Sequence, residues 1–236
     1  MVLLIAEEGP LRAAIESELR DAEIPTHVAP ADHDDLWLEA KGHEAIVYLP
    51  SASLLDGHLA PAPNPERMRE VLGAAGAPGV EVVVPVFPVG EAWDAEVTVM
   101  KRHGRPYAAL RAHPLLEEIA GLVPGDAQAL LLPRIGRAAY CRAATVAAAV
   151  REAIRTEQQG RVSEVEAESS DVAALVQRAA EATHAPVRVR ALWPWLFRLA
   201  RPLFRWFRRR EAQLLEALAL LVPELAEPRP ALPTRR

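Results

Sequence analysis

The chain has 236 residues, half of them apolar and a quarter charged, a composition that supports one sizeable hydrophobic core. Its single cysteine, Cys141, excludes a disulfide framework and a thiolate metal cluster, and it favours a reducing, cytoplasmic setting. No apolar stretch approaches the length of a membrane-spanning helix, and Met1 to Ile5 is too short for a signal peptide.

Charge is distributed unevenly along the chain, whose formal net charge is −5. Residues 1–60 contain three basic residues against twelve acidic ones, whereas residues 188–210 contain eight arginines and no acid. This asymmetry indicates an electrostatic face or a partner surface near the C-terminus.

The first part of the chain alternates short apolar runs with amphipathic segments, the pattern of parallel strands buried on both faces by crossover helices. In chain order we expect a strand at 2–6, a helix at 11–22, a strand at 25–29, a short helix at 32–41 and a strand at 44–49. Each helix is punctuated by Gly or Pro, as helix ends commonly are.

The same alternation continues after a Pro- and Ala-rich loop at 50–65. The next expected elements are a helix at 66–75, a strand at 80–87, a helix at 92–103 and a strand at 107–112. Five strands with intervening helices predict an α/β fold with a doubly wound, mainly parallel, Rossmann-like sheet, whose core spans residues 1–115.

Residues 116–226 are predicted to form the C-terminal part of the same domain, a small α/β extension. The expected elements are a strand at 129–133, an Ala-rich helix at 137–156, a strand at 163–167, a helix capped by Ser169 to Asp171, and an edge strand at 186–191. Three prolines in residues 227–236 predict a tail without regular structure.

Four segments carry a likeness to a known family. They are the strand, turn and helix of 2–19, the strand 43–49, the helix, turn and strand of 68–84, and the Gly-Arg-Pro-Tyr-Ala-Ala-Leu-Arg strand of 104–111. In their order and spacing they resemble the atypical and extended short-chain dehydrogenase/reductases, in particular NmrA-like NAD(P)-binding members. The resemblance implies a Rossmann fold and a dinucleotide site at the first turn.

The family's first turn is a G-x-x-G-x-x-G segment, in which backbone amides and a helix N-terminus approach the pyrophosphate. The matching positions here are Ala6, Gly9 and Arg12, so one glycine remains. Glu7 and Glu8 would place carboxylates beside the phosphates. We therefore expect a weak, degenerate cofactor site, in which Arg12 is the alternative phosphate ligand; an ordinary acidic helix start is the other interpretation.

A second departure lies between the strands at 25–29 and 44–49, which only about fourteen residues separate. The family has another βα unit there, next to the position that selects the adenosine ribose. Asp32 is the nearest candidate for this role, and a helix cap is its alternative.

The third departure concerns catalysis. Many family members use a Tyr followed four residues later by a Lys, which lowers the Tyr pKa so that the phenol acts as a general acid. The tyrosines of this chain lack that lysine: Tyr48, Tyr107 and Tyr140 are followed by Ala52, Arg111 and Ala144. Ordinary hydride transfer is therefore not expected.

Polar side chains near the predicted carboxyl edge of the sheet suggest a pocket, because open α/β folds bind ligands there. The candidate lining residues are Tyr48, Ser51, Ser53, Phe87, Arg111 and His113. The alternative is that they are surface residues at loop ends. The seven histidines form no HxxxH or HExxH pair, and no metal site is predicted.

Residues 193–210 hold six of the twelve aromatic residues, interleaved with arginines. We expect a partner surface that includes Trp193, Trp195, Arg198, Arg201, Arg205 and Trp206. A protein partner or homo-oligomer is the first expectation, an anionic membrane surface the alternative. The aromatic side chains could instead cover the protein's own core. Nucleic acid is not expected, since the chain is net acidic.

Together these patterns predict a catalytically degenerate short-chain dehydrogenase/reductase-like protein, a pseudoenzyme that serves as a regulatory, scaffolding or partner-binding subunit without a cofactor. The alternative is an unusual enzyme that uses the pocket at the carboxyl edge of the sheet. It would be an NAD(P)H-dependent reductase, with NADP or NAD as cofactor, or a cofactor-free cyclase or isomerase acting on a small molecule.

Overall fold

The structure is a computed structural model that describes residues 1–55, 63–123, 129–133, 136–155, 160–184 and 188–192, together with Leu214 and Leu218. Packing divides the chain into two units, Met1–Ile119 with Ala139–Glu168, and Ala120–Ala138 with Ser169–Arg236. The first unit therefore takes in a helix and a strand beyond residue 115. The expected partner surface at 193–210 and the tail at 227–236 lie outside the described residues.

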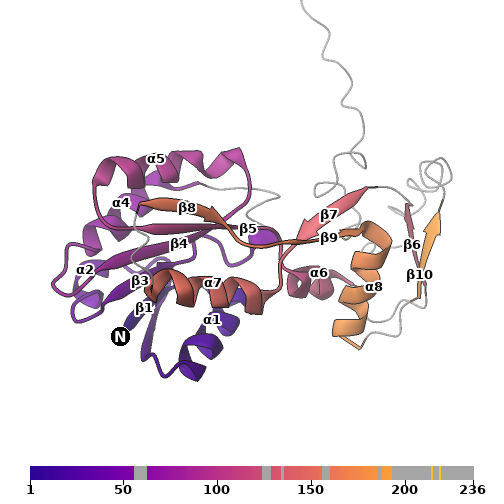
Figure 1. Ribbon diagram of the computed structural model, residues 1–236, viewed down its shortest axis with the longest axis horizontal. Helices are drawn as coiled ribbons and strands as arrows, with labels where there is room; N and C mark the ends of the chain where they lie inside the picture. The colour runs from indigo at the N-terminus through magenta and orange to yellow at the C-terminus, as the bar shows by residue number, and fades with distance from the viewer. Residues whose placement is uncertain are drawn as a thin grey trace, which may run out of the picture. The chain divides into compact units, whose positions relative to one another are not determined.

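The first unit is built on a six-stranded sheet in which every neighbouring pair is parallel (Figure 1). Its strand order is β2-β1-β3-β4-β5-β8. The strands are β1 (Val2–Ile5), β2 (Thr26–Ala29), β3 (Ala45–Tyr48), β4 (Val82–Pro88), β5 (Ala108–Ala112) and β8 (Arg161–Glu164). The predicted doubly wound, Rossmann-like sheet is confirmed.

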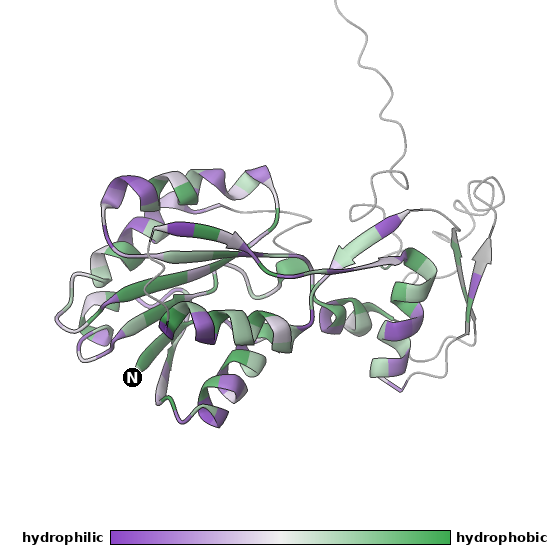
Figure 2. Cartoon of the chain, viewed as in Figure 1, coloured by the Kyte–Doolittle hydropathy of each residue, from purple (hydrophilic) through white to green (hydrophobic). Residues whose placement is uncertain are grey.

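Helices cover both faces of this sheet, so its central strands read as continuous apolar runs (Figure 2). One face packs against α1 (Pro10–Asp21) and α7 (Ala143–Arg155). The other face packs against α2 (Leu36–Glu39), α4 (Pro65–Ala74) and the helix α5 (Asp94–His103), which follows the 3₁₀ turn η1 (Glu91–Trp93). Alternate residues of each strand enter the two layers, as the two-residue period of a strand requires.

Helix α2 is the one element between β2 and β3, which confirms the short connection predicted there. It is shorter than the expected helix at 32–41. Asp35 caps it by accepting a hydrogen bond from the backbone N–H of Leu38 at 3.2 Å. Asp32 is therefore not the cap of this helix.

The remaining elements are α6 (Leu116–Leu122), β6 (Ala129–Pro133), β7 (Arg137–Tyr140), β9 (Glu168–Asp171), α8 (Val172–Ala182) and β10 (Arg188–Leu192). Strand β10 pairs in parallel with β6, and β7 pairs with β9. Among the described residues, no helix combines the length and the apolar character needed to cross a membrane.

Two expectations beyond residue 115 have opposite outcomes. The prediction that a helix begins at residue 137 was wrong for its first residues. Residues 137–140 form β7, and α7 begins only at Ala143. Buried Tyr140 donates from its hydroxyl to Glu168 Oε2 of β9 at 2.7 Å, and such pairing overrides the helix propensity of alanine. The predicted cap is confirmed, since Asp171 accepts from the N–H of Ala174 at 2.9 Å.

Candidate functional site

The topology creates a switch point at the carboxyl ends of β1 and β3. From β1 the chain crosses to β2 on one side, and it then returns to β3 on the other side of β1. Connections that leave adjacent strands in opposite directions open a crevice, which is where open α/β folds bind ligands. The turn at residues 6–9 follows β1 and the loop at 49–55 follows β3, so both lie at this switch point.

Gly9 lies at the N-cap of α1 in an extended conformation (φ 174°, ψ 170°), which any residue can adopt. Its small size is nevertheless required. A Cβ at this position would lie 2.5 Å from the backbone oxygen of Ala52, in the loop after β3. The one glycine that remains of the family's three is thus explained by a close approach of two backbones across the switch point.

The other residues of the first turn have few features of a phosphate site. Ala6 is buried, and its N–H donates to the carbonyl of Ala29 at 3.0 Å. Glu7 and Glu8 are exposed. Arg12 pairs along its own helix with Glu16, with 2.6 Å between Nε and Oε1. The N-cap residue of α1 is Gly9, which has no side chain to cap the helix.

A carboxylate that the sequence analysis missed holds the loop after β3. Glu118, on α6, accepts hydrogen bonds from the backbone N–H groups of Leu54 and Leu55 at 2.8 Å each and of Leu115 at 3.2 Å. Burial raises the pKa of Glu118, and these amide donors offset part of the rise. The spacing between Leu115 and Glu118, typical of a helix-capping pair, was the available signal.

Arg67 of α4 holds the loop after β2, where dinucleotide-binding relatives select the adenosine ribose. Its guanidinium donates to the carbonyl of Ala31 from Nε (2.9 Å) and Nη2 (2.7 Å), and to the carbonyl of His33 from Nη2 (2.8 Å). Glu70 pairs with Nη1. No local pattern indicated this role, because Arg67 and Ala31 are 36 residues apart.

The structure places Tyr48 and Phe87 in the core beneath α4 and α5. Tyr48 is 4% exposed, and burial raises its pKa to about 12. Phe87 is fully buried and stacks on Trp93 with ring centroids 5.7 Å apart. Ser51 and Ser53 bond to each other, from Ser51 Oγ to the Ser53 carbonyl at 2.7 Å. Tyr48 and Phe87 are therefore core residues, whereas Ser51 and Ser53 are half-buried in the loop after β3.

Arg111 and His113 lie at the carboxyl end of β5, where Arg111 pairs in register with Phe87 of β4. A hollow of about 510 Å³ is lined by Asp94, Val97, Thr98, Lys101, Arg111, Val162, Ser163 and Glu164. Nη2 of Arg111 forms an ion pair with Asp94, and His113 Nε2 lies 3.1 Å from Glu164 Oε1. Tyr107, four residues before Arg111, is buried in the core. Among the described residues, no group of three or more His, Cys, Asp and Glu side chains has a metal-binding arrangement.

No protein-family model and no curated protein matches this sequence. The fold is similar to that of an NADPH-dependent quinone oxidoreductase from Escherichia coli, in complex with NADPH, with TM-score 0.65, 16% identity, and coverage of 96% of this chain and 91% of that one. A nucleoside-diphosphate-sugar epimerase from Staphylococcus aureus aligns with TM-score 0.62 and 14% identity over 95% and 90% of the two chains. Triphenylmethane reductase from Citrobacter, in complex with NADP(H), aligns with TM-score 0.63 and 11% identity. The alignment covers 94% of this chain and 90% of that one.

These neighbours are reductases and an epimerase, two of them in complexes with NADPH or NADP(H). The six-stranded parallel sheet and the switch point therefore give the chain a Rossmann-like fold, which it shares with these proteins. The resemblance seen in the sequence is confirmed at the level of the fold.

Proposed function

We propose that this chain is a catalytically degenerate relative of the short-chain dehydrogenase/reductases that acts as a regulatory, scaffolding or partner-binding subunit. The close approach of the Ala52 carbonyl to Gly9 across the switch point carries this proposal. A carbonyl directs the negative end of its dipole toward the turn that holds pyrophosphate in dinucleotide-binding relatives. Exposed Glu7 and Glu8 add like charge beside the same turn.

The chemistry of the tyrosines supports the same proposal. None is followed four residues later by a lysine. Burial raises the pKa of Tyr48 to about 12, which makes it a poor proton donor near neutral pH. Tyr107 is buried, at 5% exposed, and so is not accessible to a substrate. The hydroxyl of Tyr140 already donates a hydrogen bond to Oε2 of Glu168.

Titration of the purified protein with NADPH and NADH, followed by nucleotide fluorescence and by the shift in melting temperature, tests this proposal. We expect no saturable binding at micromolar nucleotide. A micromolar Kd for either nucleotide would overturn the proposal as stated. An extended short-chain reductase of known affinity, titrated in the same buffer, is the positive control.

The second candidate is an NAD(P)H-dependent reductase with a degenerate turn. It is favoured by the N-terminus of α1, where the N-cap residue Gly9 has no capping side chain and Arg12 lies in the first turn. In that case the protein should oxidise NADPH in the presence of a quinone. Arg12→Gln should then weaken the binding of NADPH and of NADH to a similar extent, because both nucleotides carry the pyrophosphate that Arg12 would bind.

A further inference from the structure

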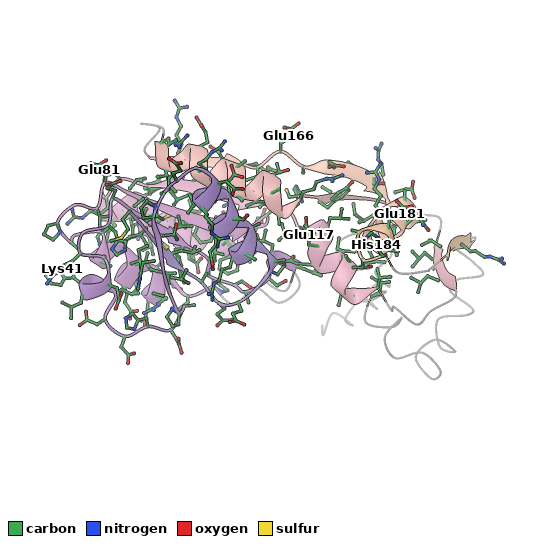
Figure 3. All side chains as sticks on the ribbon, turned by 90° about the horizontal axis from the view of Figure 1, so that it is seen from below. Lys41, Glu81, Glu117, Glu166, Glu181 and His184 are labelled. Atoms are coloured by element: carbon green, nitrogen blue, oxygen red, sulfur yellow. The ribbon has the colours of Figure 1, made fainter. Side chains whose placement is uncertain are left out.

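Two consecutive glutamates of α6, Glu117 and Glu118, accept hydrogen bonds from different segments of the chain. Glu118 accepts from the N–H groups of Leu54 and Leu55 in the loop after β3. Glu117, labelled in Figure 3, accepts from the N–H of Ala143 at 3.1 Å and so caps α7. The two residues share a helix and a charge, but within the described contacts only Glu118 bonds to the loop.

Glu118 is well placed to fix that loop. Leu54 and Leu55 begin a helical turn, whose first N–H groups have no partner within the turn. The carboxylate supplies the acceptors, and its negative charge lies at the positive end of the backbone dipoles. The side chains of Leu54 and Leu55 are 2% and 3% exposed, so the turn is held by the core as well as by Glu118.

The position of Ala52 follows from this anchor. Two residues of extended chain span at most about 7 Å, so fixing the N–H of Leu54 closely restricts where the Ala52 carbonyl lies. The bond between Ser51 Oγ and the Ser53 carbonyl shapes the intervening backbone. The carbonyl of Ala52 is thereby kept against Gly9.

We propose that Glu118 is a positioning residue that keeps the loop at 51–55 closed on Gly9, and that this loop controls access of the diphosphate of a dinucleotide to the switch-point crevice. The proposal rests on the proposed function, because it explains how the same crevice is kept from nucleotides. Releasing the Leu54 and Leu55 amides would let the Ala52 carbonyl withdraw and leave the N-terminus of α1 open to an anion.

The test compares Glu118→Ala with the matched control Glu117→Ala in the full chain. Hydrogen exchange of peptides covering 51–55 measures loop release, and NADPH titration measures access. We expect Glu118→Ala to speed exchange at 54–55 and to tighten NADPH binding about tenfold or more, the size of effect expected when hydrogen bonds to a charged group are lost. Glu117→Ala should leave both readouts unchanged, even if it lowers stability.

Glu118→Gln keeps one acceptor oxygen and should change both readouts in the same direction by less, which provides the test if the alanine variant does not fold. If hydrogen exchange at 54–55 is unchanged in the Glu118 variants, the proposed role of Glu118 is overturned. Faster exchange without tighter NADPH binding overturns it as well. Micromolar NADPH binding by the unmodified chain overturns the proposed function instead. The difference between the Glu118 and Glu117 variants still decides the role of Glu118 in that case.

Discussion

Gly9 and Gly73 differ in what an added methyl group would meet. At Gly9 a Cβ would lie 2.5 Å from the backbone oxygen of Ala52, whereas Gly73, in α4, has open space around it. Gly9→Ala should lower the free energy of unfolding by about 1–3 kcal/mol, because a backbone must move. Gly73→Ala should raise it by about 0.5–1 kcal/mol, because alanine favours the helix. Urea unfolding measures the change in both variants. Equal changes in the free energy of unfolding would contradict the close approach of Ala52 to Gly9.

Glu96 is a buried acid of α5. It is 1% exposed, and neither carboxylate oxygen has hydrogen-bond geometry with another described residue. Burial raises its pKa above the ordinary value of 4.5, and the backbone N–H groups of Glu96 itself and of Asn64 offset only part of the rise. Since the folded state holds the proton more tightly, the stability from this group is complete below pH 4.5 and is lost as pH rises through the folded-state pKa.

Glu96→Gln should therefore raise the free energy of unfolding at neutral pH by about 1 kcal/mol and remove this part of its decline with pH. Urea unfolding from acidic to neutral pH measures the effect. Exposed Glu81, labelled in Figure 3, offers the control Glu81→Gln, which should follow the unmodified protein. A Glu96→Gln protein that is less stable at neutral pH would show that the carboxylate has a partner.

At the scale of elements, α4 and the loop after β2 are joined through Arg67, which donates to the carbonyls of Ala31 and His33. Arg67→Met keeps much of the aliphatic chain but leaves these acceptors unpaired, at a cost of about 1–3 kcal/mol. Hydrogen exchange in the loop at 30–34 should increase and the melting temperature should fall. Arg69→Met, at an exposed position of the same helix, should change neither.

At the scale of the whole molecule, charge is segregated along the chain, with an acidic first quarter and eight arginines in residues 188–210. We predict self-association or partner binding through residues 193–210 that weakens with salt, because salt screens exposed charges. Sedimentation velocity at low and high salt measures it, and replacing Arg198, Arg201 and Arg205 by Gln should abolish the salt dependence. Sedimentation independent of salt would oppose this prediction, and co-sedimentation with anionic vesicles would favour the membrane alternative.

The sequence by itself determined the sheet and most of its helices. Runs such as Val82 to Val84 are buried on both faces of a parallel sheet, and this pattern is local enough to read from neighbouring residues. The short connection between β2 and β3 and the cap at Asp171 were also predicted, since spacing and caps are local properties. Residues 137–140 were not, because their alanines suit a helix and only the pairing of β7 with β9 makes them a strand.

The tertiary structure alone decided what the candidate site is made of. Glu118 meets Leu54 across 64 residues of chain, and Arg67 meets Ala31 across 36. A pattern of neighbouring residues does not predict such long-range hydrogen bonds, because they depend on how the crossover connections bring the ends of the strands together. The contact between Glu118 and Leu54 also holds the loop whose residue Ala52 lies against Gly9. The turn that resembles a degenerate nucleotide site in the sequence packs closely, in the fold, against the loop after β3.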